Sequence, residues 1–138
     1  MKLKLVALAT VLFVVSLQVH AQDSSTGLPT ILSDSYGYDF GPYLNGVITR
    51  IRTNWYALMP EIARNGEKGR VIVGFIIARS GELKDLRLLA SSGNVVLDRA
   101  AVAAVSSSNP LPALPTAFKG ERLALELPFL YNLKSQER

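Results

Sequence analysis

A proline inside the last apolar segment of the chain constrains the fold more than any other residue. Residues 121–132 alternate with a period of two, which is typical of a β-strand. Pro128 lies in the middle of this pattern. Because proline has no backbone N–H to donate to a neighbouring strand, it is confined to sheet edges and bulges. We therefore expect residues 121–132 to form an edge strand, with Pro128 turned outward.

A second segment, residues 70–79, is apolar on both faces. Val73 and Phe75 lie on one face, and Ile72 and Ile76 lie on the other. A strand without a polar face is typical of a central position in a sheet. We expect this segment to be the middle strand.

A tight turn follows the central strand. Residues 80 and 81 are Ser and Gly, a pair that favours a hairpin. Beyond the turn, residues 82–91 mix apolar with charged side chains, which predicts a half-exposed strand. The two strands are expected to pair as a hairpin.

Two segments carry apolar residues at spacings of three and four, which predicts helices over residues 42–58 and 96–106. Trp55 lies on the apolar stripe of the first helix, so we expect it to anchor the core. Pro60 follows and ends this helix. Asp98 falls in the first turn of the second helix, where a carboxylate interacts favourably with the helix dipole.

These elements predict an α+β domain with the order helix, strand, strand, helix, strand (α-β-β-α-β). A right-handed connection through the second helix places the last strand beside the first and antiparallel to it. The expected sheet is three-stranded and antiparallel, with strand order 2-1-3 and both helices on one face. On the other face, Ile72 and Ile76 either form a contact surface or are covered by the segment around Tyr36 and Tyr38 that precedes the first helix.

The chain begins with a segment typical of a secretory signal. Residues 1–21 combine two lysines with a short apolar run and end in Val-His-Ala. A membrane anchor is the alternative, but a spanning helix needs about 20 apolar residues. We expect cleavage after Ala21 and a periplasmic location, with anchoring in the inner membrane as the alternative.

The rest of the chain divides into three parts. Residues 22–41 are rich in Ser, Gly and Asp and contain no Lys or Arg, which predicts a flexible lead-in. Residues 42–133 form the expected domain. Residues 134–138 are a polar tail.

The composition excludes several classes of function. The chain has no cysteine, and its one histidine, His20, belongs to the segment expected to be removed. This excludes His- or Cys-based catalysis, zinc ligation by these residues, and disulfides. The net charge of +4 falls to +2 without Lys2 and Lys4, which is too mild to predict nucleic-acid binding.

The carboxylates give no sign of an enzyme. Glu61, Asp85 and Asp98 lie on separate expected elements, without the spacing of a catalytic acid pair. We therefore expect no catalytic residue, no cofactor, no metal and no small-molecule substrate.

Six short motifs together resemble the C-terminal domain of TonB and TolA proteins. They follow one another in the family's order from about residue 43 to residue 132. The motifs are Asn54-Trp55-Tyr56 with Met59-Pro60-Glu61, the run Gly69-Arg70-Val71-Ile72-Val73-Gly74-Phe75-Ile76-Ile77, Ser80-Gly81, Ser91-Ser92-Gly93 followed by Leu97-Asp98-Arg99-Ala100-Ala101, Leu111-Pro112-Ala113-Leu114-Pro115, and Leu127-Pro128-Phe129-Leu130-Tyr131-Asn132.

The resemblance implies a protein-binding module. In this family the domain binds an extended segment of an outer-membrane transporter, which joins the sheet as an extra strand through backbone hydrogen bonds. On this chain the last strand would be the binding edge, and a bound segment would be held mainly on the N-terminal side of Pro128. The residues expected to present outward backbone groups are Arg122, Ala124, Glu126, Pro128 and Leu130.

Two alternatives remain beside a periplasmic module that binds a transporter or another envelope protein. The open edge would equally serve self-pairing in a homodimer. A retained N-terminal segment would instead make a short, inner-membrane-anchored energy transducer. A lead-in of about twenty residues, at about 3.5 Å per residue, is too short to cross a periplasm, so we do not expect energy transduction by this chain alone.

Overall fold

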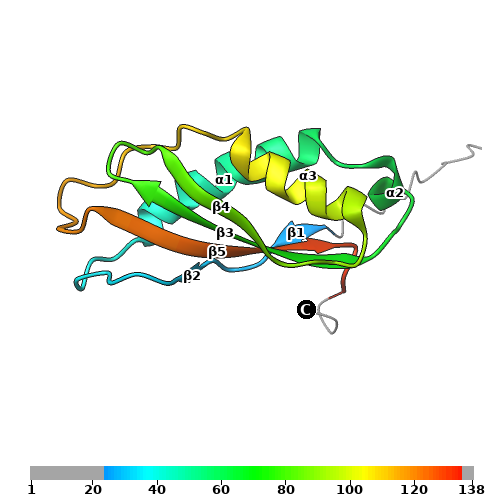
Figure 1. Ribbon diagram of the computed structural model, residues 1–138, viewed down its shortest axis with the longest axis horizontal. Helices are drawn as coiled ribbons and strands as arrows, with labels where there is room; N and C mark the ends of the chain where they lie inside the picture. Colours follow the sequence, from blue (N-terminus) through cyan, green and yellow to red (C-terminus); the bar gives the residue numbers. More distant parts are fainter. Residues whose placement is uncertain (1–23, 135–138) are drawn as a thin grey trace, which may run out of the picture.

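The structure is a computed structural model that describes residues 24–134. The expected signal segment and the last four residues of the expected tail lie outside the described residues. The elements in chain order are β1 (Ser25–Thr26), β2 (Thr30–Ile31), α1 (Gly41–Ala57), α2 (Glu61–Arg64), β3 (Gly69–Ala78), β4 (Leu83–Ala90), α3 (Val95–Ser106) and β5 (Arg122–Tyr131) (Figure 1).

The five elements expected from apolar periodicity are all present, and their ends lie within one residue of the expected positions. The buried residues of α1 are Val47, Ile48, Ile51 and Trp55, which form the apolar stripe that predicted the helix. Helix α3 starts where the Asn94 side chain accepts a hydrogen bond from the backbone N–H of Val96. The short helix α2 and the strands β1 and β2 were not expected.

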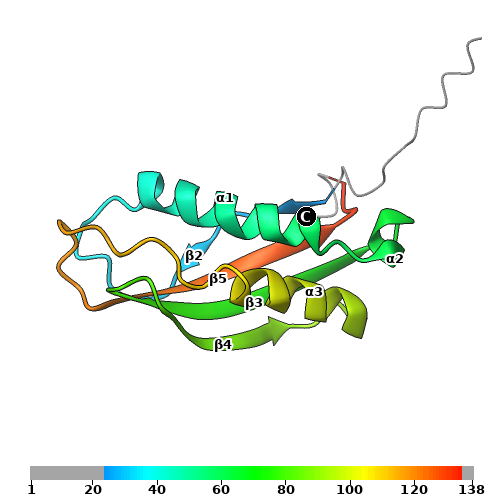
Figure 2. The same ribbon diagram turned by 90° about the horizontal axis from the view of Figure 1, so that it is seen from above.

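The α+β class is confirmed, and the sheet is antiparallel with β3 at its centre. The strand count of three was wrong, because the sheet has five strands in the order β1-β5-β3-β4, with β2 also paired to β5. Both α1 and α3 lie above the sheet in Figure 1, and Figure 2 shows them side by side over it. The edge position of β5 was also wrong, because the lead-in pairs with its outer side.

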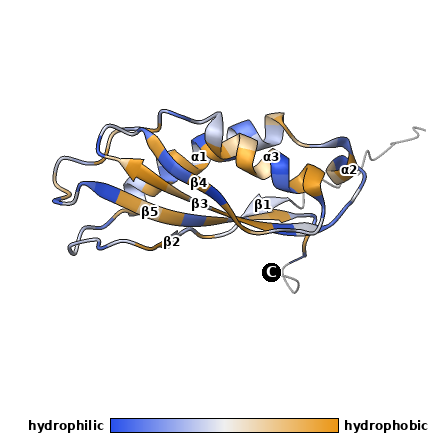
Figure 3. Cartoon of the chain, viewed as in Figure 1, coloured by the Kyte–Doolittle hydropathy of each residue, from blue (hydrophilic) through white to orange (hydrophobic). Residues whose placement is uncertain are grey.

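The core forms between this helical layer and the inner face of the sheet, where the apolar residues of β3 and β5 meet the helices (Figure 3). Trp55 is fully buried and donates from Nε1 to the hydroxyl of Tyr131 at 2.8 Å. That hydroxyl in turn donates to the carbonyl oxygen of Leu97 at 2.8 Å. Burial raises the pKa of Tyr131 to about 12, so the phenol stays neutral and keeps α1, α3 and β5 joined.

The opposite face of the sheet is only partly exposed. Leu89 lies over Gly74, where an added Cβ would meet Leu89 Cδ1 at 2.7 Å. Leu32 from the lead-in and Ile76 line the same shallow hollow. Ile72 and Ile76 are half-buried on this face.

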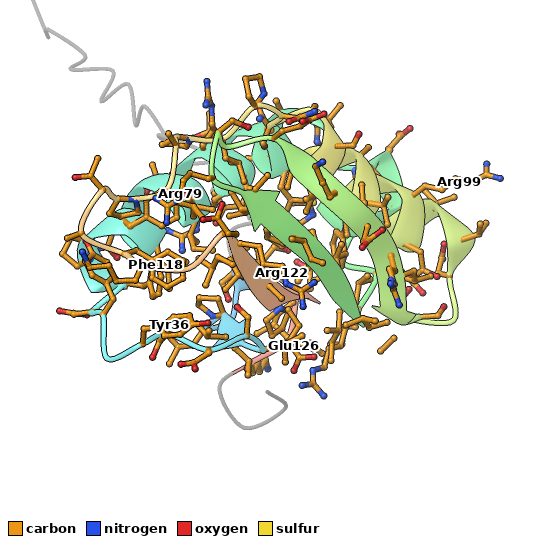
Figure 4. All side chains as sticks on the ribbon, turned by 60° about the vertical axis from the view of Figure 1, so that its left-hand side comes forward. Tyr36, Arg79, Arg99, Phe118, Arg122 and Glu126 are labelled. Carbon is orange, nitrogen blue, oxygen red and sulfur yellow. The ribbon has the colours of Figure 1, made fainter. Side chains whose placement is uncertain are left out.

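The tyrosines that were one candidate cover for this face pack elsewhere. The rings of Tyr38 and Phe40 are 4.8 Å apart, and those of Tyr36 and Phe118 are 6.0 Å apart. Arg79 lies over the Phe118 ring at 5.7 Å, and Figure 4 shows the two side chains close together at one end of the molecule. We call Tyr36, Tyr38, Phe40 and Phe118 the aromatic cluster.

Asp98 holds the start of α3 to the loop before it. Its carboxylate accepts hydrogen bonds from the Ser92 backbone N–H at 2.9 Å, from the Ser92 hydroxyl at 2.7 Å, and from the Ser91 hydroxyl. Burial by itself would raise the pKa of Asp98, but these hydrogen bonds outweigh it and hold the pKa below its ordinary value. These contacts give Asp98 a structural role, because they join the first turn of α3 to the loop before it.

We expect Asp98→Asn to lower the free energy of unfolding at pH 7 by about 1–3 kcal/mol, because the amide replaces a charged acceptor in a buried network. A carboxylate whose pKa is lower in the folded state than in the unfolded state adds to the free energy of unfolding. This contribution is fully present above the unfolded-state pKa of about 3.9 and disappears as the pH falls through the folded-state pKa. Urea unfolding between pH 7 and pH 2 should therefore show the variant converging on the wild type in acid. The control is Asp85→Asn at an exposed position with φ +49°, which asparagine tolerates. A constant difference at every pH would contradict the assignment.

Candidate partner-binding edge

Strand β5 has one side that is part of the fold and one side that faces the lead-in. Its inner side pairs with β3 over ten residues, from Gly69 opposite Tyr131 to Ala78 opposite Arg122. In an antiparallel strand, alternate residues direct their backbone groups to opposite sides. The even-numbered residues of β5 direct theirs away from β3.

The lead-in occupies these outward groups on the N-terminal side of Pro128. Strand β2 pairs with β5 so that Thr30 lies opposite Glu126. The backbone N–H of Leu32 donates to the carbonyl oxygen of Ala124 at 2.8 Å. The N–H of Ala124 donates to the hydroxyl of Ser33 at 2.9 Å. A side chain of the lead-in thus completes the hydrogen bonding where β2 ends.

Pro128 divides the lead-in into its two strands. Strand β1 pairs with β5 beyond the proline, with Ser25 opposite Leu130, and β2 pairs before it. At the proline itself only the carbonyl oxygen is used, and it accepts from the N–H of Gly27 at 2.9 Å. An added Cβ on Gly27 would lie 3.1 Å from Pro128 Cγ, so the absence of a side chain permits this approach.

The N-terminal end of the described lead-in is also held by side chains. Ser24 is buried, and its hydroxyl accepts from the N–H of Asn132 at 3.1 Å. The Tyr56 hydroxyl donates to the Ser24 carbonyl oxygen at 3.0 Å. Arg52 Nη2 donates to the Thr26 hydroxyl at 3.0 Å.

The residues expected at the binding edge therefore lie in one row, but in different surroundings. Ala124, Glu126 and Pro128 are half-buried beside the lead-in, whereas Leu130 is buried. Arg122 is exposed at the end of the strand, beyond the bond between Ala124 and Ser33, and Figure 4 shows Arg122 and Glu126 on the same strand.

Sequence reasoning missed the residues that meet this row, chiefly Gly27, Leu32 and Ser33. A β-branched pair followed by leucine, residues 30–32, was the one local signal of a strand there. Two-residue strands are too short for a periodic pattern to reveal them.

The opposite edge of the sheet, β4, is built differently. Its pairing with β3 shifts register between Ile72 and Val73 and again between Gly74 and Ile76. Exposed Lys84, Asp85 and Arg87 line this strand. Bulges and charges of this kind are what sheet edges use to discourage pairing with another chain.

Within residues 24–134, no group of three or more His, Cys, Asp or Glu side chains is placed to hold a metal ion. None of the helices in the same range is long and apolar enough to cross a membrane.

Comparison with known proteins agrees with this architecture. Residues 40–129 match the family described as TonB C terminal. The chain is similar to an NMR solution structure of the TonB C-terminal domain of Helicobacter pylori, at 27% identity over 72% of this chain and 87% of that chain, with a TM-score of 0.50. A shorter structure of the same H. pylori domain is 26% identical over 62% of this chain and 91% of that chain, with a TM-score of 0.48. Comparison with curated proteins gives no match.

The domains of this family are periplasmic, are typically non-enzymatic and generally bind outer-membrane transporters. The matched range covers α1 to all but the last two residues of β5, which is nearly all of the helical layer and the three long strands. This chain belongs to the TonB C-terminal domain family.

Proposed function

We propose that this protein is a non-enzymatic periplasmic module that binds an extended segment of an envelope protein, such as a TonB-dependent outer-membrane transporter. The segment adds to the sheet as an antiparallel strand along the outer side of β5. Affinity comes mainly from backbone hydrogen bonds, and no catalytic residue takes part.

One observation carries this proposal: the outer side of β5 already accepts an antiparallel extended chain. The carbonyl oxygens of Ala124 and Pro128 accept N–H groups of the lead-in at 2.8 and 2.9 Å. Those bonds depend on backbone groups, which any extended peptide supplies. The bulged and charged β4 is the poorer of the two edges for the same purpose.

The test uses the full chain, labelled with nitrogen-15, and synthetic peptides tiled across the periplasm-facing segments of a TonB-dependent transporter from the same genome. The largest shift changes on titration are expected at the N-terminal half of β5, from Arg122 to Glu126. Hydrogen exchange should show stronger added protection at Ala124 than at Leu130. Shifts confined to β4 or α3, or no binding by any peptide, would overturn the proposal.

We expect Arg122→Pro to weaken binding of such a peptide about five- to tenfold, because one outward N–H disappears and one hydrogen bond is worth about 1 kcal/mol. The position suits this test because Arg122 lies one outward position beyond Ala124, whose N–H donates to Ser33 of the lead-in. The matched control is Arg122→Gln, which removes the charge and keeps the N–H. Equal weakening by both variants in a fluorescence anisotropy titration would show that charge, not strand addition, drives binding.

The alternatives bear differently on the same edge. A homodimer paired through β5 would have to displace the lead-in, as a transporter segment would, so the occupied outer side of β5 does not distinguish the two. A membrane-anchored transducer depends on residues outside the described range, and its domain would bind through the same strand.

A further inference from the structure

The lead-in and a partner strand need the same atoms. The outward row of β5 offers one carbonyl oxygen at Ala124 and one at Pro128, and Leu32 and Gly27 already donate to them. The N–H of Ala124 is likewise used by Ser33. A second strand therefore has no free place beside β5 while the lead-in stays in position.

We infer that residues 24–33 are a built-in competitor for the partner site, and that a partner binds by exchanging with them. This inference rests on the proposed function, and it adds how the site is regulated and what the partner must carry. The lead-in is then a self-ligand whose release sets the apparent affinity for the partner.

The contacts of the lead-in are suited to exchange. Strands β1 and β2 have two residues each, against the ten-residue pairing of β5 with β3. Leu28, between the two strands, and Leu32, directly after β2, are exposed at 89% and 56%, and Ile31 packs against the core only partly buried. Elements with few buried apolar contacts open at lower free energy than the core. The lead-in can therefore leave β5 while the rest of the domain stays folded.

The aromatic cluster keeps the released segment near its site. Phe40 is buried, and Tyr38 and Phe118 each contact its ring at 4.8 Å. Tyr36, Tyr38 and Phe40 follow residue 33 closely in the chain, so the competing segment, residues 24–33, remains tethered near β5 when it is released. A short flexible tether gives an effective concentration in the millimolar range. A partner must overcome that local concentration to bind.

The close approach of Gly27 to Pro128 indicates which residue a partner segment needs at this position. A Cβ added at Gly27 would lie only 3.1 Å from Cγ and 3.2 Å from Cβ of the proline ring. Contacts that close require the neighbour to move, and a proline ring has little freedom to do so. A segment that follows the same path carries glycine or another small residue where it donates to the Pro128 carbonyl oxygen.

The decisive experiment locks the competitor in place. Thr30→Cys with Glu126→Cys puts two thiols on directly opposed residues, about 5.5 Å apart between Cα atoms, which is within the range of a disulfide. The wild-type chain has no cysteine, so this bond forms without competition. The control pair, Ile76→Cys with Lys84→Cys, makes the same crosslink between β3 and β4 and leaves the lead-in free.

With the transporter peptide as probe, oxidation of the Thr30/Glu126 pair should weaken binding at least tenfold, and reduction should restore it. Oxidation of the control pair should change nothing. Unchanged binding by the locked form would overturn the competitor while leaving the proposed function intact. Failure of the wild-type chain to bind the peptide would overturn both. A covalent dimer on a non-reducing gel would show that the lead-in pairs with a second copy, which overturns an intramolecular competitor.

A second variant tests the same inference without a crosslink. Gly27→Val should displace β1 from β5, so the amide of Asn132, which donates to Ser24, should exchange faster and the transporter peptide should bind several-fold more tightly. Leu28→Ala, at the exposed neighbour, is the control and should do neither. Slower exchange or weaker binding in Gly27→Val would contradict the inference.

Discussion

Replacing Trp55 with alanine should remove about 3–5 kcal/mol from the free energy of unfolding. Trp55 is completely buried, and its ring makes edge contacts with Phe129 at 5.2 Å and Tyr131 at 4.9 Å. The change leaves a cavity between α1 and β5 and removes the donor to the Tyr131 hydroxyl. Small domains are stable by about 5–15 kcal/mol in total, so the variant should be near its unfolding threshold.

The measurement is urea unfolding followed by far-UV circular dichroism, because the chain has one tryptophan and the variant has none to fluoresce. Tyr36→Ala is the control, since it truncates an aromatic side chain that is 63% exposed. Its expected loss is at most about 1 kcal/mol. If Trp55→Ala cost no more than the control, the packing of α1 on β5 described above would be incorrect.

The second large effect is expected at Gly81, in the turn between β3 and β4. Its φ is +94°, and an added Cβ would lie 2.0 Å from the carbonyl oxygen of Leu111. The Leu111 N–H donates to the Gly81 carbonyl oxygen at 2.9 Å. The segment between α3 and β5, which we call the connector, therefore lies directly against this turn. We expect Gly81→Ala to cost about 2–5 kcal/mol, from the unfavourable φ together with the forced movement of the connector.

Gly93 provides the matched control for this prediction. Its φ is +86°, but nothing lies within 4 Å of an added Cβ. Gly93→Ala therefore carries the backbone cost alone, about 1–2 kcal/mol. The difference between the two variants in urea unfolding measures the contact with Leu111. Equal losses would mean that the connector does not lie against the turn.

Much of the fold followed from local patterns. The apolar periodicity of residues 42–58 and 70–79 located α1 and β3 within one residue. A helix that buries one stripe has apolar residues in every turn, and a strand that buries both faces is apolar at nearly every residue, so both patterns are visible in the sequence. The right-handed connection through α3 then placed β5 beside β3. Helix α2 was missed because four residues are too few for a periodic signal.

Local sequence patterns predicted only part of the candidate site. The alternation along β5 and the position of Pro128 indicated which backbone groups face away from β3. The binding role of Arg122, Ala124, Glu126, Pro128 and Leu130 remains a prediction. Nothing in the local pattern of the lead-in showed that it would lie against them.

The sequence by itself determined the long elements, their order and the strand that carries a proline. These features depend on the spacing of apolar residues and on the backbone N–H that proline lacks. Only the tertiary structure decided what fills the outer side of β5. Ser33 and Ala124 are 91 residues apart in the chain, yet they share a hydrogen bond. Backbone groups are nearly the same in every residue, so the choice of a strand's neighbour depends on which segment the folded domain brings within reach.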